Sequence, residues 1–128
     1  MKAEGIYQLT TLSSLRKAAP FESLRSYLRE AVGLGLPLAF GTDAGVIPHG
    51  TNAAEFAELS SIGLSAVDAI RAATLNAARA VGLENQVGTL RPGAFADVIG
   101  VEGNPLEDLQ ALGRVKFIMK AGRIFLAP

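Results

Sequence analysis

The sequence has no cysteine and a single histidine among its 128 residues. Without cysteine, disulfide frameworks and thiolate metal sites are excluded. Twelve basic side chains balance twelve acidic ones, so there is no excess of one charge to attract nucleic acid or an anionic membrane. We therefore expect no nucleic-acid partner and no membrane partner. The small basic cluster of Arg16 and Lys17 is expected on a solvated helix surface.

Long apolar runs are also absent. The most apolar stretch, residues 31–40, is interrupted by Gly33, Gly35 and Pro37, and it is far shorter than the roughly 20 residues that span a membrane. The first residues contain no apolar run of the kind that forms the core of a signal peptide. A cytoplasmic location is therefore expected.

The remaining composition is that of a folded protein, with 49% hydrophobic and 19% charged residues. Residues 21–34 carry an apolar stripe at helical spacing, which predicts a helix that ends at Gly33 and Gly35. Residues 36–41 are apolar at nearly every position, which is typical of a strand buried on both faces in a parallel sheet. Together they form half of a βα repeat. Residues 1–20 show only a weak pattern, with three leucines at helical spacing.

Two more helices are predicted in the middle of the chain. Asn52 is expected to cap a short helix over 53–62, and Ser65 with Asp68 three positions later indicates a capping box for the next helix, over 67–81. In that helix we expect the Thr74 hydroxyl, on the apolar stripe, to bond to a carbonyl one turn earlier. Asn76 could tie the helix to a neighbouring loop.

The pattern changes after Gly82. Short strands are predicted over 87–90, 96–101, 115–120 and 123–126, because glycine and proline turns separate short apolar runs. The last two strands should form a hairpin about Ala121 and Gly122. Asp97 is expected to be a structural carboxylate that accepts backbone amides. We place a domain boundary between an α/β segment, residues 1–84, and a small β segment, residues 85–128.

Asp43 is the first candidate for chemistry. It follows a predicted buried strand at the point where the chain enters a glycine-rich loop, and catalytic groups of βα barrels lie at that edge. A carboxylate there can bind a divalent metal or take a proton from a metal-bound water. The alternative is a cap of the turn that bonds to amides near Gly45. His49, in the same loop, is either a surface residue or a ligand, and the flanking Pro48 and Gly50 indicate a loop of defined shape.

Four sequence blocks, in this order, resemble the amidohydrolase superfamily, and within it the imidazolonepropionase-like and prolidase-like enzymes. They are Phe-Gly-Thr-Asp-Ala-Gly at 40–45, Pro-His-Gly at 48–50, the run from Ala72 to Gly82 that begins Ala-Ala-Thr-Leu-Asn-Ala-Ala, and Gly-Thr-Leu-Arg-Pro-Gly-Ala-Phe-Ala-Asp-Val at 88–98. The resemblance runs from about residue 21 to the end of the chain.

The resemblance implies the final β/α elements of a TIM-like barrel and a small β-sandwich that contains the C-terminal strands. It implies a hydrolase of amide, ester or related bonds that uses one or two divalent metals, commonly zinc. Asp43 matches the aspartate at the end of the eighth strand, which binds the metal and shuttles the proton. His49 matches a histidine at the mouth of the site, where it would contact substrate, a small molecule or a dipeptide.

The departure from the family pattern is equally informative. Family enzymes take further ligands from earlier strands, namely a His-x-His pair, often a modified lysine, and two later histidines. This chain has one histidine, and the resemblance places one barrel strand in it, the eighth. A catalytic zinc site needs about three protein ligands, and Asp43 with His49 supplies two at most. We therefore expect the chain alone to be inactive, as a C-terminal segment of the enzyme.

Two functions follow from this. The first is a part of a metal-dependent C–N hydrolase. The second is a truncated domain that serves assembly or ligand binding without a metal. In either case the open edges of a lone barrel strand predict association, as a homo-oligomer formed by strand exchange or with a chain that supplies the rest of the barrel.

Overall fold

The structure is a computed structural model that describes residues 5–17 and 20–128. The predicted segment 1–84 includes residues 1–4, 18 and 19, which lie outside the described residues. The described part of the chain contains no helix that is both long and apolar enough to cross a membrane.

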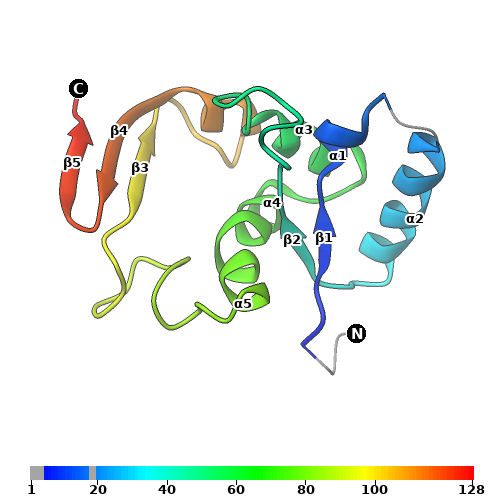
Figure 1. Ribbon diagram of the computed structural model, residues 1–128, viewed down its shortest axis with the longest axis horizontal. Helices are drawn as coiled ribbons and strands as arrows, with labels where there is room; N and C mark the ends of the chain where they lie inside the picture. Colours follow the sequence, from blue (N-terminus) through cyan, green and yellow to red (C-terminus); the bar gives the residue numbers. More distant parts are fainter. Residues whose placement is uncertain (1–4, 18–19) are drawn as a thin grey trace.

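The N-terminal half contains two parallel strands, not one. Strand β1 (Gln8–Thr10) pairs with β2 (Leu38–Phe40), with Gln8 opposite Leu38, and the short helix α1 (Leu12–Leu15) and the longer α2 (Phe21–Gly33) lie between them in the chain. Figure 1 shows α2 beside this pair. The sequence predicts one strand in this half, over 36–41; it does not predict β1, because residues 1–20 show no alternation typical of a strand. The helix predicted over 21–34 is confirmed.

The core forms where β2 meets the helices. Its buried members are Leu12, Leu28, Leu38, Leu59, Ile62, Ala69 and Ala72. Each large side chain among them contributes roughly 1.5–3 kcal/mol when fully buried. Within the predicted strand 36–41, Leu38 is buried at 3% exposure, whereas Leu36 and Phe40 are half-buried. The Phe40 ring packs on Phe56 with centroids 4.6 Å apart.

After β2 the chain forms α3 (Ala54–Ser61), α4 (Ala66–Arg71), the π-helical turn η2 (Ala72–Asn76) and α5 (Ala77–Ala80). The cap predicted at Asn52 is wrong: α3 begins after Ala53, and no side chain caps it. The cap at Ser65 is confirmed, since its hydroxyl accepts the Asp68 N–H at 3.2 Å.

The helix from α4 to α5 packs against β2. Asn76 Nδ2 donates to the Leu38 carbonyl at 2.9 Å, so it ties the helix to a strand, not to a loop. The Thr74 hydroxyl bonds to the Ile70 carbonyl at 2.8 Å, as predicted. Thr74 is nevertheless exposed and not on the apolar stripe.

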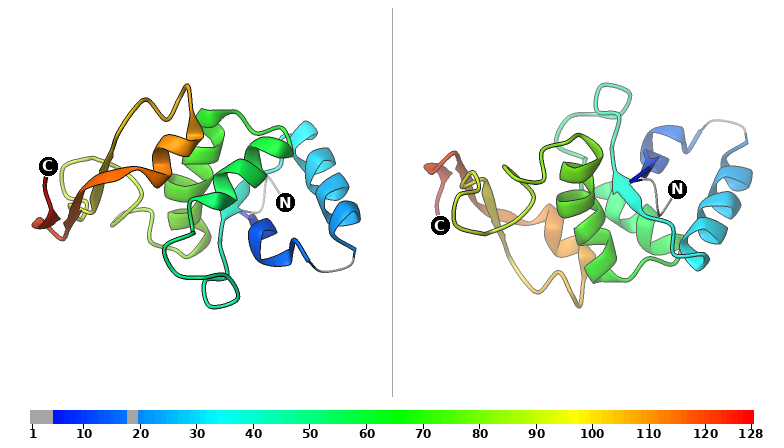
Figure 2. Two further views of the ribbon diagram at one scale, coloured as in Figure 1. Left: turned by 90° about the horizontal axis from the view of Figure 1, so that it is seen from above. Right: turned by 90° about the horizontal axis from the view of Figure 1, so that it is seen from below.

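The C-terminal part is a three-stranded antiparallel sheet in the order β3 (Val98–Val101), β4 (Val115–Lys120) and β5 (Arg123–Leu126), with the 3-10 helix η3 (Leu109–Gly113) between β3 and β4. Figures 1 and 2 place it at the opposite end of the molecule from α2. The hairpin is confirmed: Ala121 and Gly122 both have positive φ, 49° and 79°, as tight two-residue turns require.

Two further expectations for this part have clear outcomes. The strand predicted over 87–90 is wrong, since residues 87–89 form bends and Leu90 belongs to no regular element. The reason lies at Gly88, which is so close to the preceding helix that a Cβ there would lie 2.7 Å from the Thr74 carbonyl oxygen. Asp97 accepts the Ala121 N–H at 2.7 Å, as predicted for a structural carboxylate.

Candidate active site at the carboxyl ends of the parallel strands

The carboxyl ends of β1 and β2 come together at one edge. The Gly41 N–H donates to the Thr10 carbonyl at 2.8 Å. A Cβ at Gly41 would lie 3.1 Å from both the Thr10 carbonyl oxygen and a Leu9 methyl. Glycine therefore permits the two strand ends to approach at the position from which the chain enters the loop.

Asp43 follows β2 by three residues, in the left-handed conformation with φ 52°. Aspartate tolerates this conformation better than most residues, yet it remains costly. The Asp43 carbonyl accepts the Val46 N–H at 3.0 Å, and the Gly45 N–H donates to the Ile47 carbonyl. The amide at Gly45 is thus occupied, and the turn-capping alternative for the carboxylate is not realised.

The Asp43 side chain is exposed, and no hydrogen bond or ion pair joins its carboxylate to any of residues 5–17 or 20–128. A carboxylate without such partners is available to a ligand. The position of Asp43 therefore suits a carboxylate that binds a ligand from outside this chain.

His49 lies further along the same loop. It is exposed and follows Pro48 in a turn closed by the Thr51 hydroxyl, which donates to the Pro48 carbonyl at 2.7 Å. The loop after β2 projects from the body of the molecule (Figure 2). The fold thus places Asp43 and His49 on one exposed loop, and no contact joins their side chains within the described ranges.

Asn52 connects the two ends of this loop, whereas the sequence predicts only a helix cap at this position. Its Nδ2 donates to the Thr42 hydroxyl at 3.1 Å, and its Oδ1 accepts the Gly50 N–H at 3.2 Å. The sequence signal was ambiguous, because an asparagine just before a helix usually serves the helix.

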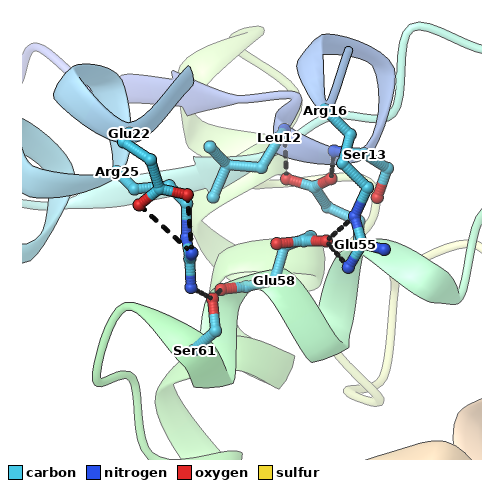
Figure 3. A network of polar contacts seen from close by, with 8 residues as sticks. All are labelled: Leu12, Ser13, Arg16, Glu22, Arg25, Glu55, Glu58 and Ser61. Atoms are coloured by element: carbon cyan, nitrogen blue, oxygen red, sulfur yellow. Dashed lines mark hydrogen bonds and ion pairs between the residues drawn. The ribbon is translucent and has the colours of Figure 1, made fainter. Parts of the chain in front are cut away.

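Two buried glutamates on α3 are also not predicted from the sequence. Glu55 is fully buried, and its carboxylate oxygens accept the N–H groups of Leu12 at 2.9 Å and Ser13 at 2.7 Å, at the start of α1 (Figure 3). Glu58 is 5% exposed and pairs with Arg16, whose Nη2 lies 2.6 Å from Oε1. Arg16 is thus on the surface as expected, but it is held in an ion pair. Together the two glutamates fasten the segment after β1 to the helix after β2.

The described residues alone do not make a metal site. Within 5–17 and 20–128 there is no group of three or more histidine, aspartate or glutamate side chains that could hold an ion, whereas a catalytic zinc needs about three protein ligands. A hollow of about 380 Å³ lies near the other end of β2, lined by residues that include Leu36, Ser65 and Arg71, so it does not belong to this edge.

Comparisons with known proteins agree on one family. The sequence model of the Amidohydrolase family matches residues 12–125. The chain is 37% identical over 110 residues to the ochratoxinase of Aspergillus niger, which is 82% of this chain and 22% of that protein. It is also 37% identical over 103 residues to the imidazolonepropionase of Syntrophobacter fumaroxidans, 77% of this chain and 23% of that protein.

Solved structures give the same result. A crystal structure of a Xaa-Pro dipeptidase with methionine bound in its active site is similar with a TM-score of 0.89 and 32% identity, over 96% of this chain and 35% of that one. The A. niger ochratoxinase structure is similar with a TM-score of 0.81 and 31% identity, over 100% of this chain and 34% of that one. The chain therefore spans about a third or less of the length of these proteins.

Proposed function

Because the chain belongs to the amidohydrolase family, we propose that it forms the C-terminal part of a metal-dependent enzyme that hydrolyses amide or related C–N bonds. The observation that carries the proposal is the Asp43 carboxylate, which is exposed just beyond the carboxyl end of β2 and has no hydrogen-bond or ion-pair partner among residues 5–17 and 20–128. Catalytic groups of βα barrels lie at this edge of the sheet. The hydrolases among the chain's relatives support the reaction class.

Asp43 is proposed to hold one position of a divalent metal, commonly zinc in this family, with the remaining ligands on barrel strands that this chain does not contain. Such a metal supplies Lewis-acid activation of the attacking water. The carboxylate of Asp43 would then accept a proton from that water and return it to the leaving nitrogen. The left-handed backbone at Asp43 supports this role, because strained residues of this kind cluster at functional sites.

The complete architecture is part of the same proposal. β1 and β2 would be the last two strands of a TIM-like barrel, and the sheet of β3, β4 and β5 would form part of a small β-sandwich, with the division near residues 84 and 85. Within the described ranges β1 and β2 pair only with each other, which leaves one edge of each strand open. We propose that a second copy or a separate polypeptide covers these edges.

The proposed substrate is a small molecule or a dipeptide, as the name of the similar Xaa-Pro dipeptidase suggests. His49, exposed on the loop that carries Asp43, would contact it. The loops that set specificity in barrels come mostly from the rest of the barrel, so the proposal ends at this substrate class.

Metal content tests the proposal against a metal-free role in assembly or ligand binding. The sample is a chimera in which this chain replaces the matching third of the Xaa-Pro dipeptidase, loaded with zinc and desalted. Elemental analysis should find stoichiometric zinc in the chimera and less after Asp43→Asn. Asp97→Asn is the matched control, because this carboxylate bonds to Lys120 in the C-terminal sheet, and it should retain the metal. Equal zinc in the Asp43 variant, or none in the unaltered chimera, would favour the metal-free role.

A further inference from the structure

The amide of Asn52 bridges the two ends of the segment that carries Asp43 and His49. Its donor bonds to Thr42, the residue before Asp43, and its acceptor bonds to Gly50, the residue after His49. A single side chain therefore fixes the distance between the points where this segment leaves and rejoins the body of the protein.

Both halves of the amide are used, which makes asparagine specifically suited to the position. A carboxamide offers donors and an acceptor on one short side chain, whereas alanine offers neither. The bond from Asn52 to Thr42 spans ten positions, whereas the bond from Gly50 to Asn52 spans two. The other hydrogen bonds of the loop are also local: Val46 to Asp43 at 3.0 Å, Gly45 to Ile47 at 3.0 Å, and Thr51 to Pro48 at 2.7 Å. Local bonds shape the turns within the loop, but they do not hold its two ends together.

The segment that carries Asn52 is itself firmly anchored. Three residues later, the buried carboxylate of Glu55 accepts the N–H groups of Leu12 and Ser13, just after β1. Thus residues 52–55 contact the loop after β2 through one side chain and the start of α1, just after β1, through another. Asn52 holds the loop against a part of the molecule that is fixed to the segment after β1.

We propose that Asn52 is a positioning residue, which keeps Asp43 and His49 in a fixed relation to the carboxyl ends of β1 and β2. The inference rests on the proposed function, in which Asp43 binds the metal and His49 contacts the substrate. It assigns the placement of the Asp43 carboxylate to a side chain that bonds to the two ends of the loop.

The first test uses the 128-residue chain and requires no ligand. In Asn52→Ala, amide hydrogen exchange measured by NMR should accelerate about two- to tenfold at Gly50 and at Val46, the expected effect of losing a modest hydrogen bond. The HN–Hα coupling of Asp43, which reports φ, should move away from its left-handed value. Unchanged exchange at both amides and an unchanged coupling would overturn the proposal.

Two variants separate a local effect from a general one. Thr42→Val removes only one of the two bonds, so Gly50 should stay protected while Val46 loses protection. Asn104→Ala is the matched control, because Asn104 also uses both halves of its amide, toward Glu107 and Leu106, in a different turn. It should leave exchange in the loop unchanged. Equal acceleration in the Asn104 variant would show a global effect and overturn the proposal.

The second test separates positioning from simple stabilisation, with alanyl-proline as the probe and the dipeptidase chimera as the enzyme. Asn52→Ala should lower kcat at least tenfold while the urea midpoint stays unchanged. A lower midpoint with unchanged kcat per folded molecule would overturn the positioning role. If the unaltered chimera does not hydrolyse alanyl-proline, the proposed function is contradicted. The hydrogen-exchange measurements would still decide whether Asn52 positions the loop.

Discussion

Replacing Glu55 should destabilise the protein far more than its place on a helix suggests. The carboxylate is fully buried and accepts two backbone N–H groups, from Leu12 and Ser13. Hydrogen bonds to a charged group contribute about 1.5–3 kcal/mol each. Glu55→Ala removes both and should lower the free energy of unfolding by about 3–6 kcal/mol, a large part of the roughly 5–15 kcal/mol that holds a typical domain folded.

Glu55→Gln isolates the chemistry, because it has nearly the same shape. The glutamine oxygen can accept one N–H, but its NH₂ group would face the other donor, so one bond is lost and one buried amide is left without a partner. We expect a loss of about 2–4 kcal/mol. The assay is urea unfolding followed by circular dichroism, in which a lower midpoint at an unchanged slope reports lower stability.

Glu22→Gln is the matched control on α2. Its carboxylate is 76% exposed and pairs with Arg25 at 3.2 Å, and exposed ion pairs contribute at most about 1 kcal/mol. If Glu55→Gln changed stability no more than Glu22→Gln, the view that Glu55 fastens the segment after β1 to α3 would be wrong.

Three further outcomes are expected. Gly88→Ala should lower the urea midpoint by the equivalent of about 1–3 kcal/mol, because φ there is +85° and the Cβ would lie 2.7 Å from the Thr74 carbonyl oxygen; an unchanged midpoint would contradict the close approach. The hydrogen bond from Lys120 holds the pKa of Asp97 below its ordinary value of 3.8, so this group stabilises the fold above that pH and ceases to do so as the pH falls through the lowered pKa. Asp97→Asn should therefore be less stable than the parent chain near neutral pH and equal to it in strong acid, and a difference that persists in acid would refute this. Sedimentation at micromolar concentration should show a mass above the 13.3 kDa of one chain, whereas a compact, folded monomer would contradict the proposed covering of the open strand edges.

Elements whose signals are local could be predicted from the sequence. The stripe over 21–34 produced α2 (Phe21–Gly33), and the strands predicted at 115–120 and 123–126 match β4 and β5 at both ends. The turn between them places both residues at positive φ, which Gly122 adopts freely and Ala121 only at a cost. Each of these features depends on residues a few positions apart.

The errors have a common physical cause, which is contact between distant segments. β1 is three residues long and exists because it pairs with β2, 30 residues later in the register. Residues 87–90 contain strand-forming residues, but the approach of Gly88 to Thr74 holds this segment in a bend. A local pattern cannot report a partner that only the folded chain provides.

The candidate site divides in the same way. Asp43 could be located because it follows a buried apolar run directly, and the structure keeps it beyond that strand in an exposed loop. Its supports could not be found, since Asn52 bonds to a residue 10 positions away and Glu55 to residues 42 and 43 positions away. Asn52 and Glu55 both lie near the start of a helix, where a sequence pattern suggests that they serve the helix end. In the fold their side chains bond to distant segments instead.

The rate at which the zinc-loaded dipeptidase chimera hydrolyses alanyl-proline tests the central claim most directly. If Asp43 holds the metal and transfers the proton, Asp43→Asn should lower kcat/KM by about 10²- to 10⁴-fold, the range for loss of a positioned acid or base, while the Asp97→Asn control keeps the parent rate. Hydrolysis by the Asp43 variant at the parent rate would contradict the assignment of this carboxylate to the active site.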